Sequence, residues 1–113
     1  MPFRVEEYLR PDGSSPFSKW FEGLSHEAAY KVLTARARME HGNLTAVKWI
    51  GTLGEYRIDW GPGLRIYLAR DGKELVMLFG GGTKKRQQAD IREAEALLAE
   101  YKRRKAETRK GRK

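Results

Sequence analysis

The strongest constraint on the fold is the segment 54–79, in which two turn signals separate three short runs of regularly patterned side chains. Apolar residues occupy every second position in EYRIDW (55–60) and LRIYLAR (64–70), which is the period of a strand with one buried face. A Gly-Pro-Gly turn follows the first run, and Asp71-Gly72 after the second is typical of a tight hairpin loop. The third run, ELVMLF (74–79), is more continuously apolar, as in a strand covered on both faces. The segment therefore predicts a three-stranded antiparallel meander.

Helix signals precede this meander. Residues 3–9 alternate loosely and indicate a first strand. Ser15-Pro16 combines an N-cap with a proline at the first helical position, which predicts a short helix ending near Glu22, with Phe17, Trp20, Phe21 and Leu24 facing the core. Ser25 is the next N-cap, and its helix is expected to run to about Glu40 or His41, with Gly42 as the stop signal. The core stripe of this second helix is interpreted as Ala29, Val32, Leu33, Ala37 and Met39. Residues 43–53 show no clear period and are interpreted as irregular.

A last helix is expected to begin between Lys85 and Gln88, because apolar residues then recur every three or four positions up to Tyr101. The predicted order is β-α-α-β-β-β-α, an α+β fold in which two N-terminal helices pack on an antiparallel sheet and a C-terminal helix follows. We expect residues 1–104 to form one domain and residues 105–113 to be a disordered basic tail. Residues 102–113 carry eight basic and one acidic residue, +7 of the net +8. That charge predicts either a solvated terminus or attraction to nucleic acid.

Composition excludes several classes of site. The chain has no cysteine and only two histidines, so neither disulfides nor a zinc site is expected, and we predict no metal and no cofactor. The N-terminus contains acidic residues and no apolar stretch typical of a signal peptide. No apolar segment is long enough to form a membrane-spanning helix. A cytoplasmic domain that does not contact a membrane is the expectation.

Cations are predicted to gather on the sheet face opposite the apolar positions. Arg57 and Arg65, with Asp59 and Tyr67, project to that face because side chains alternate along a strand. A loop expected after Phe79 carries three glycines and then Lys84, Lys85 and Arg86, which the meander brings near the two arginines. Such a cluster favours an anion, and phosphate matches the arginine fork. A solvated polar face with a flexible loop is the alternative.

The glycines and the tyrosine suggest that this anion belongs to RNA. Gly81 and Gly82 have no Cβ, so a sugar-phosphate chain can approach their backbone, and the Tyr67 ring offers a stacking surface. The glycines are not a P-loop, because no Gly-Lys-Ser or Gly-Lys-Thr follows. RNA also supplies its own nucleophile, the 2′-hydroxyl. The protein then has to orient the attack and stabilise the charge that develops on phosphorus, which arginine and lysine can do.

The segments GEYRID, LRIYLA, DGKELVMLFGGGTKK and QQADIREAEALLAEYKRR, with SPFSKWFEGL before them, resemble the phage-derived, HigB-like branch of the RelE/ParE superfamily of type II toxins. The resemblance covers about residues 3–104. It implies a metal-independent endonuclease that cuts messenger RNA on the ribosome and inhibits translation. It also implies a cognate antitoxin, a helix-turn-helix protein similar to HigA. Operator DNA is then bound only by the toxin–antitoxin complex, through the antitoxin.

Carried over residue by residue, the resemblance assigns catalysis to Arg57, Arg65, Lys84 and Lys85. Arg65 holds the scissile phosphate, and one of the two lysines stabilises the transition state or donates the proton. RelE has a lysine where this chain has Asp59, and a tyrosine after its final strand has no counterpart here. Asp59, Lys84 and Asp90 therefore stay open as the general base. Two alternatives also stay open: a ParE-like inhibitor of DNA gyrase without an active site, and a degenerate member that only binds antitoxin or nucleic acid.

Overall fold

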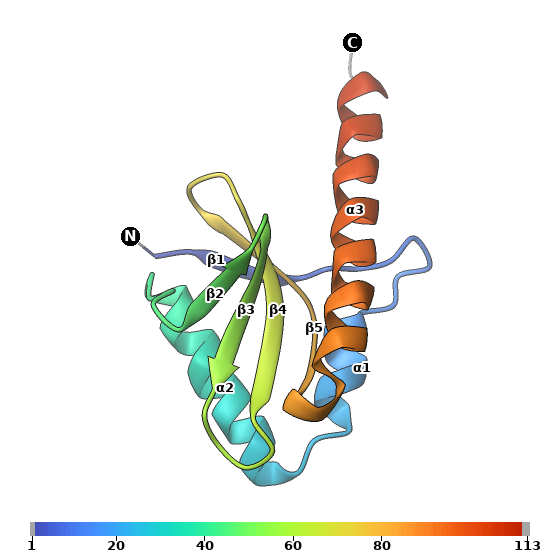
Figure 1. Cartoon of the computed structure of the whole chain (residues 1–113). Helices are drawn as coiled ribbons and strands as arrows, with labels where there is room; N and C mark the ends of the chain where they lie inside the picture. The colour runs from blue at the N-terminus through green and yellow to red at the C-terminus, as the bar shows by residue number, and fades with distance from the viewer. Residues whose placement is uncertain (1, 112–113) are drawn as a thin grey trace.

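A computed structural model describes residues 2–111 and contains a five-stranded sheet with three α-helices, which confirms the α+β class. Figure 1 shows the helices on both sides of the strands, with the C-terminal helix rising well beyond the sheet. The elements in chain order are β1 (Arg4–Glu7), α1 (Pro16–Glu22), α2 (His26–Glu40), β2 (Val47–Ile50), β3 (Leu53–Ile58), β4 (Leu64–Asp71), β5 (Leu75–Thr83), the 3-10 helix η1 (Lys84–Arg86) and α3 (Gln87–Gly111).

The sheet order is β1-β5-β4-β3-β2, in which β1 pairs parallel with β5 and all other pairs are antiparallel. The meander therefore has four strands, and the interpretation of residues 43–53 as irregular is wrong for residues 47–50 and 53, whereas residues 43–46 do lie outside any helix or strand. A hairpin turn at Gly51 and Thr52 joins β2 to β3, and Gly51 has a positive φ of 62° that suits glycine. Strand β2 has only four residues, too few to establish an alternation in the sequence.

Strand β5 does not end at Phe79, where the sequence predicted a loop. It continues to Thr83, and Gly80, Gly81 and Gly82 pair with residues 67, 66 and 65 of β4. The register shifts between residues 67 and 68, which leaves Phe79 as the extra residue of a β-bulge, and Gly80 beside it has a φ of 146°. The glycines are thus ladder residues of a bent strand, and the prediction of a loop directly after Phe79 is wrong.

Both faces of the sheet are covered. Alternate residues of β3, β4 and β5, among them Tyr56, Ile66 and Leu78, pack with α1 and α2 in a first core. The intervening residues, among them Tyr67, Met77 and Phe79, pack against α3 in a second core with Ala94, Leu97 and Leu98. Burying each of these leucines contributes about 2 kcal/mol. Helix α3 therefore covers most of the second face of the sheet. Only the end of that face next to the start of α3 is left for charged side chains.

Helix α2 differs from the sequence prediction in its buried residues, whereas α1 agrees with it. The buried stripe of α2 is Ala28, Val32, Ala35 and Met39, whereas Leu33 is 53% exposed and Ala37 is also exposed. The predicted stripe was therefore partly wrong, because spacings of three and four fit either set of small residues. In α1, Phe17 is buried and Trp20 and Phe21 pack against the first core together with Leu24, which follows the helix, as predicted.

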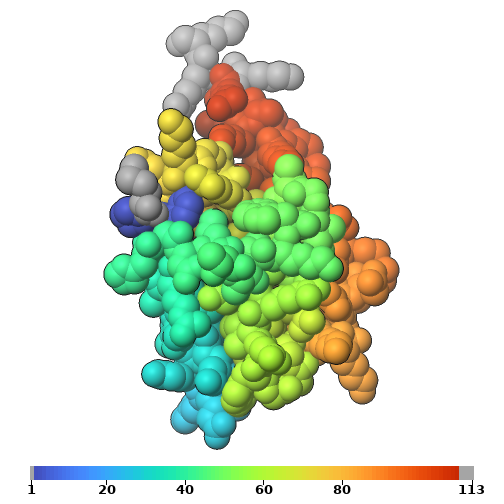
Figure 2. Space-filling view, turned by 60° about the vertical axis from the view of Figure 1, so that its left-hand side comes forward, coloured from blue at the N-terminus to red at the C-terminus, as the bar shows by residue number. Residues whose placement is uncertain are grey.

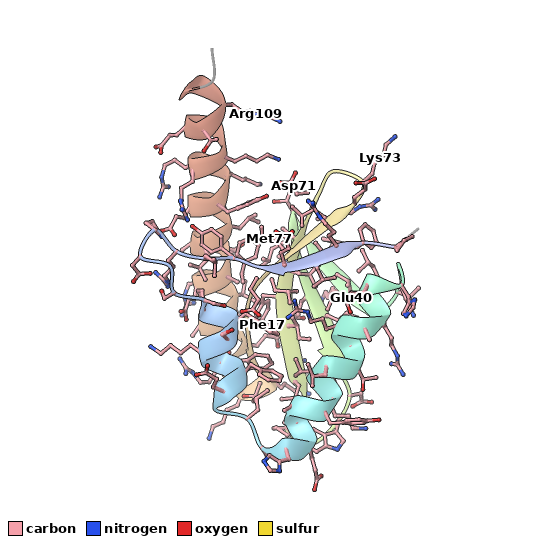
Figure 3. All side chains as sticks on the ribbon, turned by 180° about the vertical axis from the view of Figure 1, so that it is seen from behind. Phe17, Glu40, Asp71, Lys73, Met77 and Arg109 are labelled. Carbon is pink, nitrogen blue, oxygen red and sulfur yellow. The ribbon has the colours of Figure 1, made fainter. Side chains whose placement is uncertain are left out.

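The tail beyond residue 104 continues α3, so the prediction of disorder is corrected for residues 105–111, while residues 112 and 113 lie outside the described part of the chain. Lys105 pairs with Asp71, the last residue of β4, at 2.6 Å, and this contact joins the helix to the sheet. Figure 3 shows Arg109 on the part of α3 that projects past the strands. No helix within residues 2–111 combines the length and apolar character needed to cross a bilayer.

Candidate functional site

Three strand ends bring cations together at one end of the second sheet face. Arg57 and Arg65 are directly paired residues of β3 and β4, and Arg65 pairs in turn with Gly82 of β5. Lys84 follows β5, and its backbone N–H donates to the Gly63 carbonyl at 3.0 Å. A Cβ built on Gly63 would lie 3.0 Å from Nη1 of Arg65 and 3.3 Å from Cβ of Lys84. We call Arg57, Arg65, Lys84, Lys85 and Arg86 the basic patch.

The members of the basic patch differ in their solvent exposure and in whether they form salt bridges. Lys84, Lys85 and Arg86 of η1 are exposed and form no salt bridge with any residue in the described part of the chain. The Arg57 side chain is 43% exposed, whereas Arg65 is only 7% exposed and donates from Nη1 to the Gly63 carbonyl at 2.8 Å. An incoming anion therefore meets Arg57 and the η1 residues first, and Arg65 lies beneath them. Figure 2 shows the orange segment that includes η1 projecting from the body beside the green strands.

A buried carboxylate underlies the basic patch. Glu55 of β3 is 0% exposed and lies 2.9 Å from Nε of Arg57 and 3.7 Å from Nε of Arg65. It also accepts hydrogen bonds from the Tyr67 hydroxyl at 3.2 Å and from the Gln87 amide at 2.9 Å. Burial alone would raise the pKa of Glu55, but the hydrogen bonds from Arg57, Gln87 and Tyr67 outweigh it and hold the pKa below its ordinary value. Glu55 is therefore ionised at neutral pH.

Glu55 was not singled out from the sequence, although a signal for it exists. It lies two residues before Arg57, so strand alternation places both side chains on one face. What the sequence does not contain is the register of β3 against β4, which brings Arg65 opposite Arg57 and makes Glu55 a partner of two guanidinium groups.

Tyr67 does not offer the stacking surface that we expected. Its ring is 1% exposed within the second core, and its hydroxyl donates to Glu55. Burial and the nearby Glu55 carboxylate raise the pKa of the phenol far above its ordinary value, so Tyr67 stays neutral. Sequence alternation placed Tyr67 on the correct face, but α3 covers that face and leaves no room for a base.

The glycines of β5 make room for side chains of the protein itself. A Cβ on Gly81 would lie 2.5 Å from the Trp20 ring of α1, and a Cβ on Gly82 would collide with the carboxylate of Asp90 in α3. The predicted role of Gly81 and Gly82 in close approach of RNA is thus corrected, because Trp20 and Asp90 already occupy the space above them. Both glycines are needed for helices to pack on the two faces of one strand.

A groove of about 860 Å³ lies between α1, the glycine segment of β5 and the first turns of α3. Arg86 and Asp90 line it on the α3 side, and Lys19 and Trp20 on the α1 side. Burial, together with Glu93, raises the pKa of Asp90, and Arg86 only partly offsets this. Of the three candidate bases, Asp90 is therefore the one that is partly buried and whose pKa is raised. Asp59 and Lys84 are both exposed to solvent.

The two histidines lie at opposite ends of α2, His26 as its first residue and His41 as its C-cap. Helix α2 covers the first sheet face, so neither imidazole belongs to the basic patch. Within residues 2–111, no group of three or more His, Cys, Asp or Glu side chains is arranged to hold a metal ion.

Comparison with known proteins identifies one relative. The chain is 36% identical over 86 residues to an uncharacterized protein of Haemophilus influenzae, and the match covers 74% of this chain and 87% of that protein. No protein-family model matches the sequence. No solved structure matches it either. The chain belongs to the same family as the Haemophilus protein.

Proposed function

We propose that the chain is the toxin of a type II toxin–antitoxin module and that it cuts messenger RNA on the ribosome. The resemblance of residues 3–104 to RelE/ParE-type toxins supports this proposal, and the basic patch carries it. Five cations from β3, β4 and η1 lie at one end of the sheet, and the three of η1 form no salt bridge within residues 2–111. Unneutralised arginine and lysine side chains in such an arrangement favour the phosphates of a nucleic acid.

The proposed reaction begins with the 2′-hydroxyl of the RNA, which attacks the neighbouring phosphorus while the bond from phosphorus to the 5′-oxygen breaks. The products are a 2′,3′-cyclic phosphate and a 5′-hydroxyl end. The outer nitrogens of Arg57 stabilise the charge on the phosphoryl oxygens, with Arg65 below adding to the positive field. Lys84 or Lys85 protonates the leaving 5′-oxygen. Asp90 accepts the proton of the 2′-hydroxyl, because its carboxylate lies over Gly82, the β5 residue paired with Arg65, and burial raises its pKa.

The partners follow from the same proposal. The toxin acts in the cytoplasm on messenger RNA bound to the ribosome, and a helix-turn-helix antitoxin neutralises it. Operator DNA is contacted only through the toxin–antitoxin complex. The positive charge of residues 102–111 in α3 favours this RNA-rich setting, because cation–phosphate attraction raises the rate of encounter.

The test is to express the chain in bacteria and to map the 5′ ends of messenger RNA. New ends should accumulate within open reading frames in the wild type, and Arg57→Ala or Lys84→Ala should reduce them at least about tenfold. Lys73→Ala is the matched control, because it removes the same exposed charge on the order of 20 Å away, at the far hairpin labelled in Figure 3. Translation that continues without new ends in the wild type would contradict the proposal.

The second candidate is a ParE-like protein that binds and inhibits DNA gyrase without chemistry of its own. Its support is that Arg57 and Arg65 both face Glu55 and that no histidine belongs to the basic patch, an arrangement also suited to pure binding. Accumulation of cleaved gyrase–DNA complexes, with intact messages, would favour this candidate over the endonuclease.

A further inference from the structure

Glu55 is the carboxylate on which three elements of the second sheet face converge. Its partners come from β3 (Arg57), β4 (Arg65 and Tyr67) and the first residue of α3 (Gln87). A fully buried carboxylate costs several kcal/mol in desolvation, and apolar side chains of similar size usually stabilise a core better. The burial of Glu55 therefore indicates a role beyond stability.

The geometry at the two arginines is specific. Both guanidinium groups turn Nε toward Glu55, at 2.9 Å for Arg57 and 3.7 Å for Arg65, so the carboxylate approaches them from the side. Contact at Nε leaves the two outer nitrogens of Arg57 available at the surface. Arg65 is fixed at a second point by the Gly63 carbonyl, and its Nε is buried without a hydrogen-bond partner. An unsatisfied buried N–H of this kind is costly and indicates a group held in place by its surroundings.

We propose that Glu55 is the positioning residue of the basic patch. It holds the plane of the Arg57 guanidinium so that the two outer nitrogens of Arg57 face an incoming phosphate, and it keeps the positive charge of Arg65 directly beneath. Through Gln87 it also fixes the beginning of α3, and thereby the three η1 cations that directly precede Gln87, relative to the strands. This inference rests on the proposed function for its effect on cleavage, but not for the arrangement of the arginines.

Charge alone and positioning predict opposite outcomes for Glu55→Gln. If Glu55 only neutralises the arginines, removing its charge strengthens the attraction for RNA and leaves cleavage unchanged or faster. If Glu55 positions them, the affinity for RNA changes by less than about threefold while the cleavage rate falls by about tenfold or more, since orientation matters most in the transition state.

The swap Glu55→Gln with Gln87→Glu separates positioning from a structural role. It preserves a carboxylate–amide hydrogen bond between the two positions and the net charge, and a glutamate at the first residue of α3 suits the helix dipole. We expect the swap to recover the midpoint of urea unfolding but not the cleavage rate, because the carboxylate no longer lies between the two Nε atoms. Recovery of both would overturn the proposal.

The experiment has two arms. In the first, single-turnover cleavage of a messenger on purified ribosomes is measured for wild type, Glu55→Gln and the swap, and binding of a short 2′-O-methyl oligouridine reports affinity without cleavage. In the second, the Arg Nε–H signals of the isotope-labelled chain are followed by NMR. Positioning predicts slow solvent exchange for the Nε protons of Arg57 and Arg65 in the wild type and fast exchange at Arg57 in Glu55→Gln.

The arms distinguish the two ways of failing. A wild type that cuts no messenger contradicts the proposed function, and the NMR arm then decides the role of Glu55 alone. Nε protons that exchange equally fast in wild type and Glu55→Gln would overturn the positioning role, whatever the enzyme activity. If Glu55→Gln does not fold, the swap takes its place in both arms.

Discussion

Two carboxylates attach α3 to the sheet, one at each end, and they differ in burial and in the number of cations they face. Asp71, at the β4–β5 turn, accepts a hydrogen bond from Tyr101 and pairs with Lys105, and its side chain is 22% exposed. Glu55, at the basic patch, is fully buried, faces two arginines and reaches α3 only through the neutral Gln87. At the Asp71 end, one carboxylate forms a salt bridge with one lysine in contact with water. At the Glu55 end, a buried carboxylate faces two arginines while the three η1 cations form no salt bridge within residues 2–111, and a functional surface is expected where such an arrangement is retained.

The largest expected difference between the two ends is in stability. Glu55→Ala leaves Arg65 buried without its counter-ion and should lower the free energy of unfolding by about 3–5 kcal/mol. Asp71→Ala removes a partly exposed pair and should cost about 1 kcal/mol or less. Urea unfolding followed by circular dichroism measures both. Equal losses at the two ends would mean that burial of Glu55 has no special consequence.

Glycines differ between the two ends as well. Gly81→Val drives a side chain into the Trp20 ring and should cost about 1–3 kcal/mol by overpacking. Gly72, in the far hairpin, has a positive φ of 70°, but a Cβ at this position would have no neighbour within 4 Å, so Gly72→Ala should cost only about 1 kcal/mol. The same urea assay compares them. A Gly81→Val variant as stable as wild type would show that Trp20 is free to move away from β5.

The pH dependence of stability should also separate the ends. The pKa values of Glu55 and Asp71 are both lowered in the fold, so each carboxylate contributes stability at neutral pH that is lost as the pH falls through its folded pKa. Unfolding free energy should therefore decline below about pH 4.5, the ordinary pKa of glutamate. Glu55→Gln should flatten this decline more than Asp71→Asn, as measured by urea midpoints at a series of pH values. The reverse order would assign the larger share of the pH-dependent stability to the partly exposed pair of Asp71 and Lys105.

Asp90 should show the smallest effect on stability, and with the opposite sign. Its pKa is raised by burial, so the stability it contributes is present at acid pH and lost as the pH rises through the folded pKa. Asp90→Asn should therefore slightly stabilise the chain at neutral pH while slowing RNA cleavage by about a hundredfold if Asp90 is the base. Urea midpoints and single-turnover rates test the two effects separately. A destabilised but fully active Asp90→Asn chain would remove Asp90 from the mechanism.

Much of the fold was predictable because its signals are local. The caps at Ser15 and Ser25 and the hairpin at Asp71-Gly72 each act within a few residues, and the structure has helices and a hairpin there. The short β2 was missed because a four-residue strand depends on its partner β3 rather than on its own pattern. The glycines of β5 were interpreted as a loop because their strand conformation depends on Trp20 and Asp90 from distant elements.

The candidate site was predictable only in part, for the same reason. Strand alternation placed Arg57 and Arg65 on one face, and proximity in sequence placed Lys84 after β5. The burial of Tyr67 and the role of Glu55 follow from α3 covering that face, which is a long-range contact that no local pattern contains.

The most direct test of the contrast between the two ends is an NMR titration of the isotope-labelled chain with 2′-O-methyl oligouridine at low salt. We expect the largest chemical-shift changes at Arg57 and at residues 84–87, with no change at Asp71 or Lys73. Changes centred on residues 102–109 of α3, with the basic patch unmoved, would contradict it.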